Sequence, residues 1–381
     1  MRRKLGLAIA AASMLLVNPL AAGAAGGTVA TVAGRSPAGF SGDGGPAADA
    51  QMHEPRMMTF APSGDMYIAD TFNHLIRKVD SAGTITTMAG KFTGFVPRDE
   101  ADCVENFGGD GGPATDATLS CPHGVAVDAA GNVYIADSAN HAIRRVDPAG
   151  AIVTVAGAGG TAGDSGDGGA GTDARIQGPK GIVLDGRGGL LIADSGNDRV
   201  KRLDLASGVI TLVAGTGNPG GAGDGGPATE ADLVEPRTLA VGPDGSIYIA
   251  EPKVHRVRRV DADGVITTFA GTGRAGFSGD GGPAGRAQLD FPRGVGTDAA
   301  GNVFIADSLN QRIRRVDSTG TIATVAGRGK ACYFSASNNC GDGGPPLEAG
   351  FATPRAVEAT PTGDLYVADT FNERIRRVTL G

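Results

Sequence analysis

Short apolar runs alternate with polar turns along most of the chain. Residues 123–157 show the pattern clearly: Gly-Val-Ala-Val-Asp and Asn-Val-Tyr-Ile-Ala-Asp are separated by a turn at 129–131, and two further runs, Ala-Ile-Arg-Arg-Val-Asp and Ala-Ile-Val-Thr-Val-Ala-Gly, follow after new turns. Runs of this kind are typical of strands, and glycine near the end of a turn supplies the positive φ that reverses the chain. The stretch therefore predicts four short antiparallel strands.

The four-strand unit recurs six times. An Ile-Ala-Asp step or a near copy ends at Asp70, Asp137, Asp194, Glu251, Asp307 and Asp369, with gaps of 67, 57, 57, 56 and 62 residues. A Gly-Asp-Gly-Gly-Pro phrase or a near copy precedes each unit, with its acidic residue at Asp43, Asp110, Asp167, Asp224, Asp280 and Asp342. A repeat that runs from end to end predicts one domain over residues 26–381.

Two architectures accommodate such a repeat, a closed propeller and a linear solenoid. Residues 27–34 resemble a fourth strand without its first three, whereas the last unit stops after its third strand. In a ring, the opening strand completes the last blade, but in a solenoid both ends would be left incomplete. We therefore predict an all-β fold, a six-bladed β-propeller of four-stranded blades closed by the N-terminal strand.

The first 25 residues predict export. A basic start, an apolar stretch and small residues suited to cleavage indicate a secretory signal peptide over residues 1–25. An uncleaved membrane anchor is the alternative, which Ser13 and Asn18 disfavour because they interrupt an already short apolar run. No later segment is predicted to span a membrane. The net charge of −7 disfavours nucleic acid as a partner, and we expect a monomer in the secreted, periplasmic or cell-envelope space.

The four cysteines, Cys103, Cys121, Cys332 and Cys340, fall within the two longest gaps of the repeat. An even number of cysteines in an exported chain indicates disulfides, and four cysteines allow three pairings. The local pairing, Cys103 with Cys121 and Cys332 with Cys340, only requires each insert to fold back on itself.

Two phrases carry a resemblance to a known family. Residues 73–75 are Asn-His-Leu, and residues 122–137 contain Gly-Val-Ala-Val-Asp followed by Gly-Asn-Val-Tyr-Ile-Ala-Asp. In these phrases, and in Gly-Asp-Gly-Gly-Pro-Ala, the chain resembles the NHL-repeat β-propeller family, including exported bacterial members and the NHL region of teneurins. The resemblance implies the fold and says little about function, because propellers carry many activities.

A basic residue follows the proline that opens the first strand of every unit. The six are Arg56, His123, Lys180, Arg237, Arg293 and Arg355. In the predicted strand order they surround one end of the central channel, which suggests an anion-binding site. The alternative, which we expect, is a set of cross-strand ion pairs with the acidic residues 14 positions later, Asp70 and its equivalents.

Metal sites and catalysis have weaker signals. The Asp-Gly loops suggest calcium, but the richest copy, from Asp164, lacks the later glutamate of a calcium loop, so we expect a turn role and no cofactor, with calcium as the alternative. His74, His141 and His255 share one repeat position away from the channel. A zinc-dependent amidating lyase of similar repeats places its ligand histidines toward the channel, and His123 is comparable to these.

Two inserts, 91–110 and 328–342, break the repeat and are predicted to rise from the same rim as the basic residues. They contribute Phe92, Phe95, Phe107, Tyr333 and Phe334. We regard Phe95 and Tyr333 as candidate interface anchors, whereas the alternative is that these rings cover small apolar clusters within the inserts.

The sequence therefore predicts an exported binding scaffold. Its partner is an extracellular or envelope protein, peptide or glycan, bound through the face that carries the inserts. A metal-dependent lyase or hydrolase in the channel is the alternative, with His123 as first ligand, and a purely structural envelope protein is a third reading.

Overall fold

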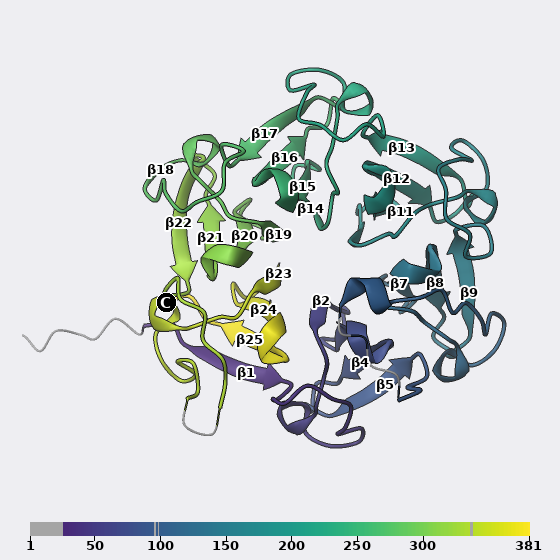
Figure 1. The fold of residues 1–381 in the computed structure, drawn as a ribbon, viewed down its shortest axis with the longest axis horizontal. Coiled ribbons are helices and arrows are strands. Elements are labelled where there is room, and N and C mark those ends of the chain that lie inside the picture. The colour runs from purple at the N-terminus through teal and green to yellow at the C-terminus, as the bar shows by residue number, and fades with distance from the viewer. Residues whose placement is uncertain (1–25, 95–96, 98, 336–337) are drawn as a thin grey trace, which may run out of the picture.

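Six β-sheets surround a central channel (Figure 1), as predicted. The computed structural model describes residues 26–94, 97, 99–335 and 338–381, so the predicted signal peptide and Phe95 lie outside the described residues. Within these ranges the chain contains strands and short 3-10 turns, and no helix is long and apolar enough to cross a membrane. The protein is a six-bladed β-propeller.

Each blade is a four-stranded antiparallel sheet whose first strand lines the channel. Blades 1 to 3 are formed by β2 (Pro55–Phe60), β3 (Met66–Asp70), β4 (Leu75–Val79) and β5 (Ile85–Ala89), by β6 (Gly124–Val127), β7 (Val133–Asp137), β8 (Ala142–Val146) and β9 (Ile152–Ala156), and by β10 (Ile182–Leu184), β11 (Gly189–Asp194), β12 (Arg199–Asp204) and β13 (Ile210–Ala214).

Blades 4 to 6 repeat this order, with two variations. Blade 4 contains β14 (Leu239–Val241), β15 (Ile247–Glu251), β16 (Arg256–Val260) and β17 (Ile266–Ala270), and blade 5 contains β19 (Pro292–Thr297), β20 (Val303–Asp307), β21 (Arg312–Val316) and β22 (Thr321–Ala326), with the short β18 (Gly282–Pro283) beside β22. Blade 6 contains β23 (Pro354–Ala359), β24 (Leu365–Asp369), β25 (Arg374–Val378) and β1 (Val29–Ala33), which pairs antiparallel with β25 (Figure 1).

Two series of 3-10 turns connect the strands. One series joins the second strand of each blade to the third: η2 (Thr71–Asn73), η5 (Ser138–Asn140), η7 (Ser195–Asn197), η9 (Pro252–Val254), η11 (Ser308–Asn310) and η13 (Thr370–Asn372). The face that carries this series is called the top face below. The other series lies between blades: η1 (Ala47–Asp49), η4 (Ala114–Asp116), η6 (Gly171–Asp173), η8 (Ala228–Glu230), η10 (Ala284–Arg286) and η12 (Pro346–Glu348). A further turn, η3 (Glu100–Asp102), belongs to the first insert.

The apolar core lies between the blades. Each of the six clusters of buried apolar residues combines two neighbouring blades, for example Ala69 and Ile76 of blade 1 with Val125 and Ile135 of blade 2. A four-stranded sheet has two faces to cover, and each blade covers them with its two neighbours. The hydrophobic stabilisation of each blade therefore depends on the closed circle of six blades.

The acidic residue that ends each second strand is buried in a repeated polar cluster. In blade 2, Asp137 accepts hydrogen bonds from the Ser120 backbone and the Asn140 side chain, and its Oδ2 lies 3.2 Å from Arg144 Nη1. Arg144 also reaches Asp110 of the inter-blade loop, at 2.5 Å. The prediction that these acids pair with the basic residues 14 positions earlier is therefore wrong: each contacts the cation seven positions later, and Glu251 lies closer still to Arg256.

The same third-strand cation recurs in all six blades. Each contacts the acid at the end of its own second strand and the acid of the preceding Gly-Asp-Gly loop, and these third-strand cations are Arg77, Arg144, Lys201, Arg258, Arg314 and Arg376. All six are completely buried. The loop aspartates lie in turns, as predicted, and they also compensate these buried charges.

The histidines that share a repeat position connect neighbouring blades. His74, His141 and His255 each adopt a left-handed backbone conformation just before a third strand, and each Nδ1 accepts a hydrogen bond from a backbone N–H of the next blade. In other blades a carboxylate or amide oxygen takes this place, as in the contact of Asp198 with the Glu235 backbone. The position is therefore structural.

Candidate functional site at the channel mouth

The six basic residues predicted from the repeat converge at the top opening of the channel. Together they line one small cavity: Arg56, His123, Lys180, Arg237, Arg293 and Arg355. These six residues are called the ring below. The cavity between them is about 20 Å³, which is room for about one water molecule.

Glycine in the first strands allows the ring to be this narrow. A Cβ atom at Gly124 would lie 2.4 Å from the Lys180 carbonyl oxygen, and one at Gly181 would lie 2.4 Å from that of Arg237. The backbones of neighbouring first strands therefore approach each other more closely than any side chain would allow.

Glu100 of the first insert lies over the ring and contacts three of its members. Its Oε1 is 2.7 Å from Arg56 Nη1 and 3.3 Å from Arg237 Nη1, and its Oε2 is 3.0 Å from Lys180 Nζ. Burial alone would raise the pKa of the Glu100 carboxyl, but the surrounding cations hold this pKa well below its usual value. Glu100 is therefore an ionised carboxylate held by charge-assisted hydrogen bonds.

The ring histidine is neutral near pH 7. Burial, followed by the charges of Lys180 and Arg56, lowers the pKa of His123 well below its usual value. Its Nε2 lies 2.6 Å from Arg56 Nη1 and 3.1 Å from Lys180 Nζ, so its lone pair is already directed at two cations. A metal ion at this nitrogen would face their repulsion. No group of three or more potential metal-ligating side chains occurs in the described part of the chain.

Positive charge exceeds negative charge at the ring. The five cations of the ring face three carboxylates, those of Glu54, Glu100 and Glu235. Burial raises the pKa of the adjacent Glu373 to about 8, so this carboxyl is largely neutral at pH 7. Among the residues that the structure describes, no carboxylate pairs with Arg293, whose pKa burial lowers to about 10.

Three ring arginines are oriented by aromatic side chains. The guanidinium carbons of Arg56, Arg293 and Arg355 lie 4.7, 4.7 and 5.1 Å from the ring centroids of Phe72, Phe291 and Phe371, respectively. Contacts of this kind stabilise a cation and fix the plane of the guanidinium group. The ring is therefore largely preorganised.

The channel below the ring is apolar, with one acidic exception. A cavity of about 140 Å³ is lined by the first strands of all six blades and includes Glu358 of β23. Burial raises the pKa of Glu358 to about 7, and no charged neighbour contributes to this shift. The channel therefore places five cations at its mouth and a weakly acidic carboxyl in its interior.

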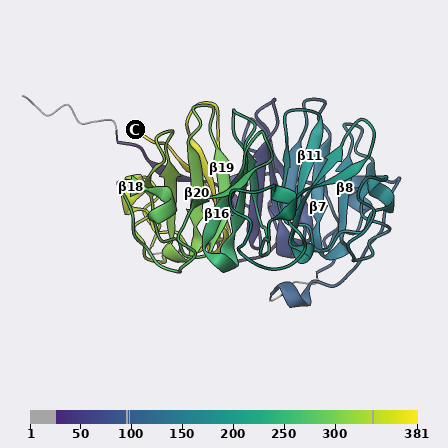
Figure 2. The ribbon, with the colours of Figure 1, turned by 90° about the horizontal axis from the view of Figure 1, so that it is seen from above.

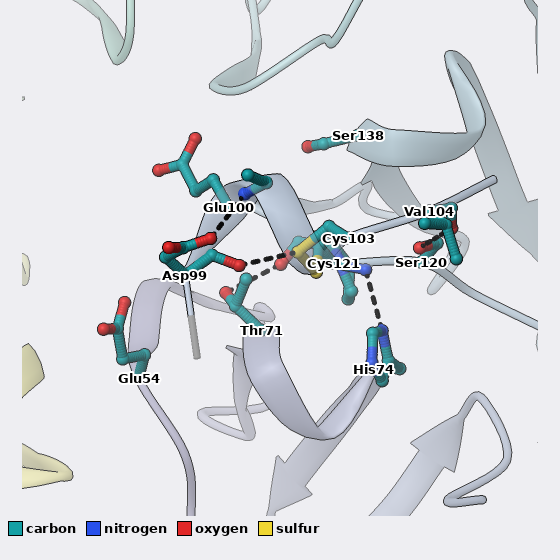
Figure 3. Close-up of a disulfide and its surroundings, with 12 residues drawn as sticks. Glu54, Thr71, His74, Asp99, Glu100, Cys103, Val104, Ser120, Cys121 and Ser138 are labelled. Atoms are coloured by element: carbon teal, nitrogen blue, oxygen red, sulfur yellow. Dashed lines mark hydrogen bonds between the residues drawn. A yellow bond between two sulfur atoms is a disulfide. The ribbon is translucent and has the colours of Figure 1, made fainter. Parts of the chain in front are cut away.

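A disulfide holds Glu100 in position. Cys103 is bonded to Cys121, and Cys332 to Cys340, which is the local pairing. Cys121 lies two residues before His123, and Cys103 directly follows η3. Figure 3 shows that the Glu100 side chain extends away from this disulfide. The first insert projects from the top face, where η3 is drawn in blue (Figure 2).

Exposed apolar side chains gather on the same face. Seven large apolar side chains are exposed among the described residues, and six of them lie in the two inserts or in the loops beside η5, η11 and η13: Val104, Phe107, Phe277, Leu309, Tyr333 and Phe371. Tyr333, which we singled out from the sequence, is 61% exposed. The seventh, Leu347, lies in η12 beside the outer strand β22.

Three aromatic residues of the inserts contact the scaffold, and one of them, Phe107, is also partly exposed. Phe107 lies under the Arg144 guanidinium at 4.7 Å, and Phe334 lies under that of Arg374 at 3.9 Å. Phe92 stacks with Phe40 at 4.7 Å. The sequence alternative placed these rings over apolar clusters within the inserts, whereas the partners of these three are scaffold residues outside the inserts.

Glu100 is the residue that sequence reasoning missed. It lies in a non-repeating insert, so no periodicity marked it, and its nearest ring partner is 44 positions away in the chain. The acidic run Asp99, Glu100 and Asp102 beside a cysteine was the available signal, because the basic ring required a counter-charge.

The ring, the channel and the inserted loops define a propeller with one irregular, charged face, and comparison with known proteins identifies its family. The family model of the teneurin NHL domain matches residues 93–165, 216–278 and 274–328. The chain belongs to the NHL-repeat β-propeller family. It is 26% identical to mouse teneurin-1 over 83% of the chain, and 29% identical to bovine NHL repeat-containing protein 2 over 84% of the chain.

These relatives are much longer proteins. The chain spans 10% of teneurin-1 and 45% of NHL repeat-containing protein 2. Among solved structures, it is similar to an auxiliary nutrient binding protein from Bacteroides thetaiotaomicron, with a TM-score of 0.64 and 16% identity over 93% of this chain and 76% of that one. Similarity at this level of identity concerns the fold.

Proposed function

We propose that the protein is an exported binding scaffold that takes an extracellular or envelope protein, peptide or glycan through its top face. The observation that carries this proposal is the distribution of exposed apolar side chains, six of seven on that face among the described residues. Exposed apolar and aromatic groups beside a charged centre are typical of binding surfaces. The structural neighbour from Bacteroides thetaiotaomicron is described as a nutrient binding protein, which supports a binding role.

The top face also contains a pocket of useful size. A cavity of about 250 Å³ lies beside the first insert and is lined by Val104, Glu105 and Asn106 together with residues of the blade 1 and blade 2 loops, including Leu119. Mixed apolar and polar lining suits a side chain or a sugar of a larger partner. The disulfides keep both inserts in shape and fit the extracellular or envelope location.

The alternative of a metal-dependent lyase or hydrolase has no comparable support. Its first ligand, His123, has its Nε2 directed at two cations, and five cations line the channel mouth and would repel a metal ion there. Calcium as a stabilising ion stays a separate proposal, for which the metal content of the purified protein is the direct measurement.

The experiment compares two exposed sites of similar chemistry. A Tyr333→Ser, Leu309→Ser variant alters the top face, whereas Leu347→Ser removes an exposed leucine away from it. Each protein is applied to peptide arrays, glycan arrays and an immobilised envelope-protein fraction. We expect the wild type and Leu347→Ser to give the same specific signals and the top-face variant to lose them at an unchanged melting temperature. Equal signals from all three proteins, or no specific signal from the wild type, would contradict the proposal.

A further inference from the structure

We propose that the ring is a receiving site for acidic peptides and that Glu100 occupies it in the free protein, in the place of a ligand carboxylate. The inference rests on the proposed function and names a ligand class for the top face. It is carried by three observations: the contacts of Glu100, the positive charge that it leaves uncompensated, and the sequence in which it stands.

The contacts of Glu100 are those that a bound carboxylate would make. Both oxygens are engaged, by Arg56, Arg237 and Lys180, at 2.7 to 3.3 Å. The Arg56 guanidinium is stacked on Phe72 and lies 2.7 Å from a Glu54 carboxylate oxygen, so two contacts other than Glu100 orient it. The site is therefore built for a carboxylate, and the insert supplies one.

One carboxylate leaves the ring under-compensated. Arg293 has no carboxylate partner among the described residues, and the buried Nε atoms of Arg56, Arg293 and Arg355 lack a hydrogen-bond acceptor. A buried guanidinium group without full pairing is costly, because water no longer solvates it. A ligand with two or more carboxylates can serve both sides of the ring, which a single glutamate cannot.

The ligand has to replace Glu100 and not join it. The space within the ring is about 20 Å³, too small for a carboxylate group beside the one already present. Glu100 is 37% exposed at its side chain, so a competitor can approach from the top face. The backbone hydrogen bonds of Ala101, Asp102 and Cys103 stay within the turn, so the ion pairs are the main contact that a competitor has to replace.

The insert itself indicates a peptide as the ligand. Residues 99–102 are Asp-Glu-Ala-Asp, and of this segment the Glu100 side chain contacts the ring, so a glutamate carried by an acidic peptide segment occupies it in the free protein. An external acidic peptide presents the same chemistry. Its apparent affinity is reduced because the tethered Glu100 competes at an effective concentration in the millimolar range.

The test uses the insert sequence as a separate molecule. The probe is an acetylated, fluorescein-labelled tetrapeptide with the sequence of residues 99–102, and binding is measured by anisotropy at low salt. We expect Glu100→Gln to bind it at least 10-fold more tightly than the wild type. Arg237→Gln added to that variant should reverse the gain. Glu348→Gln, which removes an exposed acid in η12, serves as the matched control and should behave as the wild type.

Two further measurements keep the result interpretable. Glu100→Asp retains the charge but shortens the side chain, so its gain in tetrapeptide affinity should be smaller than that of Glu100→Gln. It replaces Glu100→Gln in the test if that variant folds poorly. Inorganic phosphate and tetragalacturonate are added as competitors, because a preference for either over the tetrapeptide would overturn the assignment to a peptide. Equal affinity of wild type and Glu100→Gln, or binding that persists without Arg237, would overturn the proposal itself.

The outcome is separate from that of the top-face experiment. Tyr333 and Leu309 do not contact the ring, so their variants should bind the tetrapeptide normally. Absence of tetrapeptide binding together with array signals that depend on Tyr333 would reject the ring inference and leave the scaffold proposal intact.

Discussion

The protein contains two sets of six basic positions that follow the same repeat, and the two sets are compensated differently. Each third-strand cation, such as Arg144, contacts two carboxylates of its own repeat, one from the strand end and one from the loop. The ring cations share three carboxylates among five, and one of these, Glu100, comes from a non-repeating insert. A repeated charge with a repeated partner belongs to the scaffold, whereas a repeated charge without one is available for another purpose.

The largest expected effect is on the third-strand cations. Arg144→Leu leaves Asp137 and Asp110 without their cation, and Asp137 is completely buried. We expect the free energy of unfolding to fall by about 3–5 kcal/mol, since an uncompensated buried charge remains. Urea denaturation followed by circular dichroism measures it. Arg237→Gln in the ring should change stability by less than about 1 kcal/mol, because its ion pairs are partly exposed. Equal losses in the two variants would remove the distinction between the sets.

The next effect concerns the covalent support of Glu100. Replacing both Cys103 and Cys121 with serine should lower the free energy of unfolding by about 2–4 kcal/mol, because the unfolded chain is no longer constrained by the disulfide. The same change at Cys332 and Cys340 should cost about 0.7 kcal/mol less, because 8 residues separate that pair and 18 separate the first. Thermal and urea denaturation of both double variants measure the difference. A larger loss from the shorter loop would show that native contacts of the inserts dominate.

The last effect concerns the unpaired acid of the channel, and it vanishes at low pH. The folded chain keeps the Glu358 proton up to about pH 7, whereas the unfolded chain loses it near pH 4.5. The carboxyl therefore destabilises the fold as the pH rises from 4.5 through 7, and Glu358→Gln should be more stable than the wild type by about 3 kcal/mol at pH 8. At pH 4 the two should be equal. Denaturant titrations at both pH values check this, and a difference that does not vary with pH would show that Glu358 is not buried as a free carboxyl.

Much of the fold follows from the sequence because the repeat states it six times. The strand boundaries in blade 2 and the convergence of the six basic positions were predicted from periodicity alone. The partner of Asp137 was predicted wrongly, because spacing across one hairpin suggested His123 while the third-strand Arg144, seven residues later, was overlooked. Arg144 also contacts Asp110, which lies in the loop between blades 1 and 2, and the position of that loop cannot be derived from strand pairing.

The counter-charge of the ring was beyond the reach of such reasoning for a different reason. Where Glu100 lies depends on the path of a unique insert, and that path is fixed by the disulfide and by electrostatic attraction. A segment that occurs only once in the chain cannot be compared with other copies. The signals that remain are compositional, here an acidic run in a protein whose channel mouth is basic.

The pairing of β1 with β25 also bears on how the protein folds. Val29 is opposite Val378, and Asp342 accepts hydrogen bonds from Thr31, so blade 6 joins residues more than 300 positions apart. Such contacts form late, because closing so long a loop costs conformational entropy before any contact repays it. Until the final strand is present, β1 has no sheet to join and blade 1 lacks one of its neighbours. The chain is therefore most exposed to aggregation and proteolysis before β1 pairs with β25 and closes the propeller.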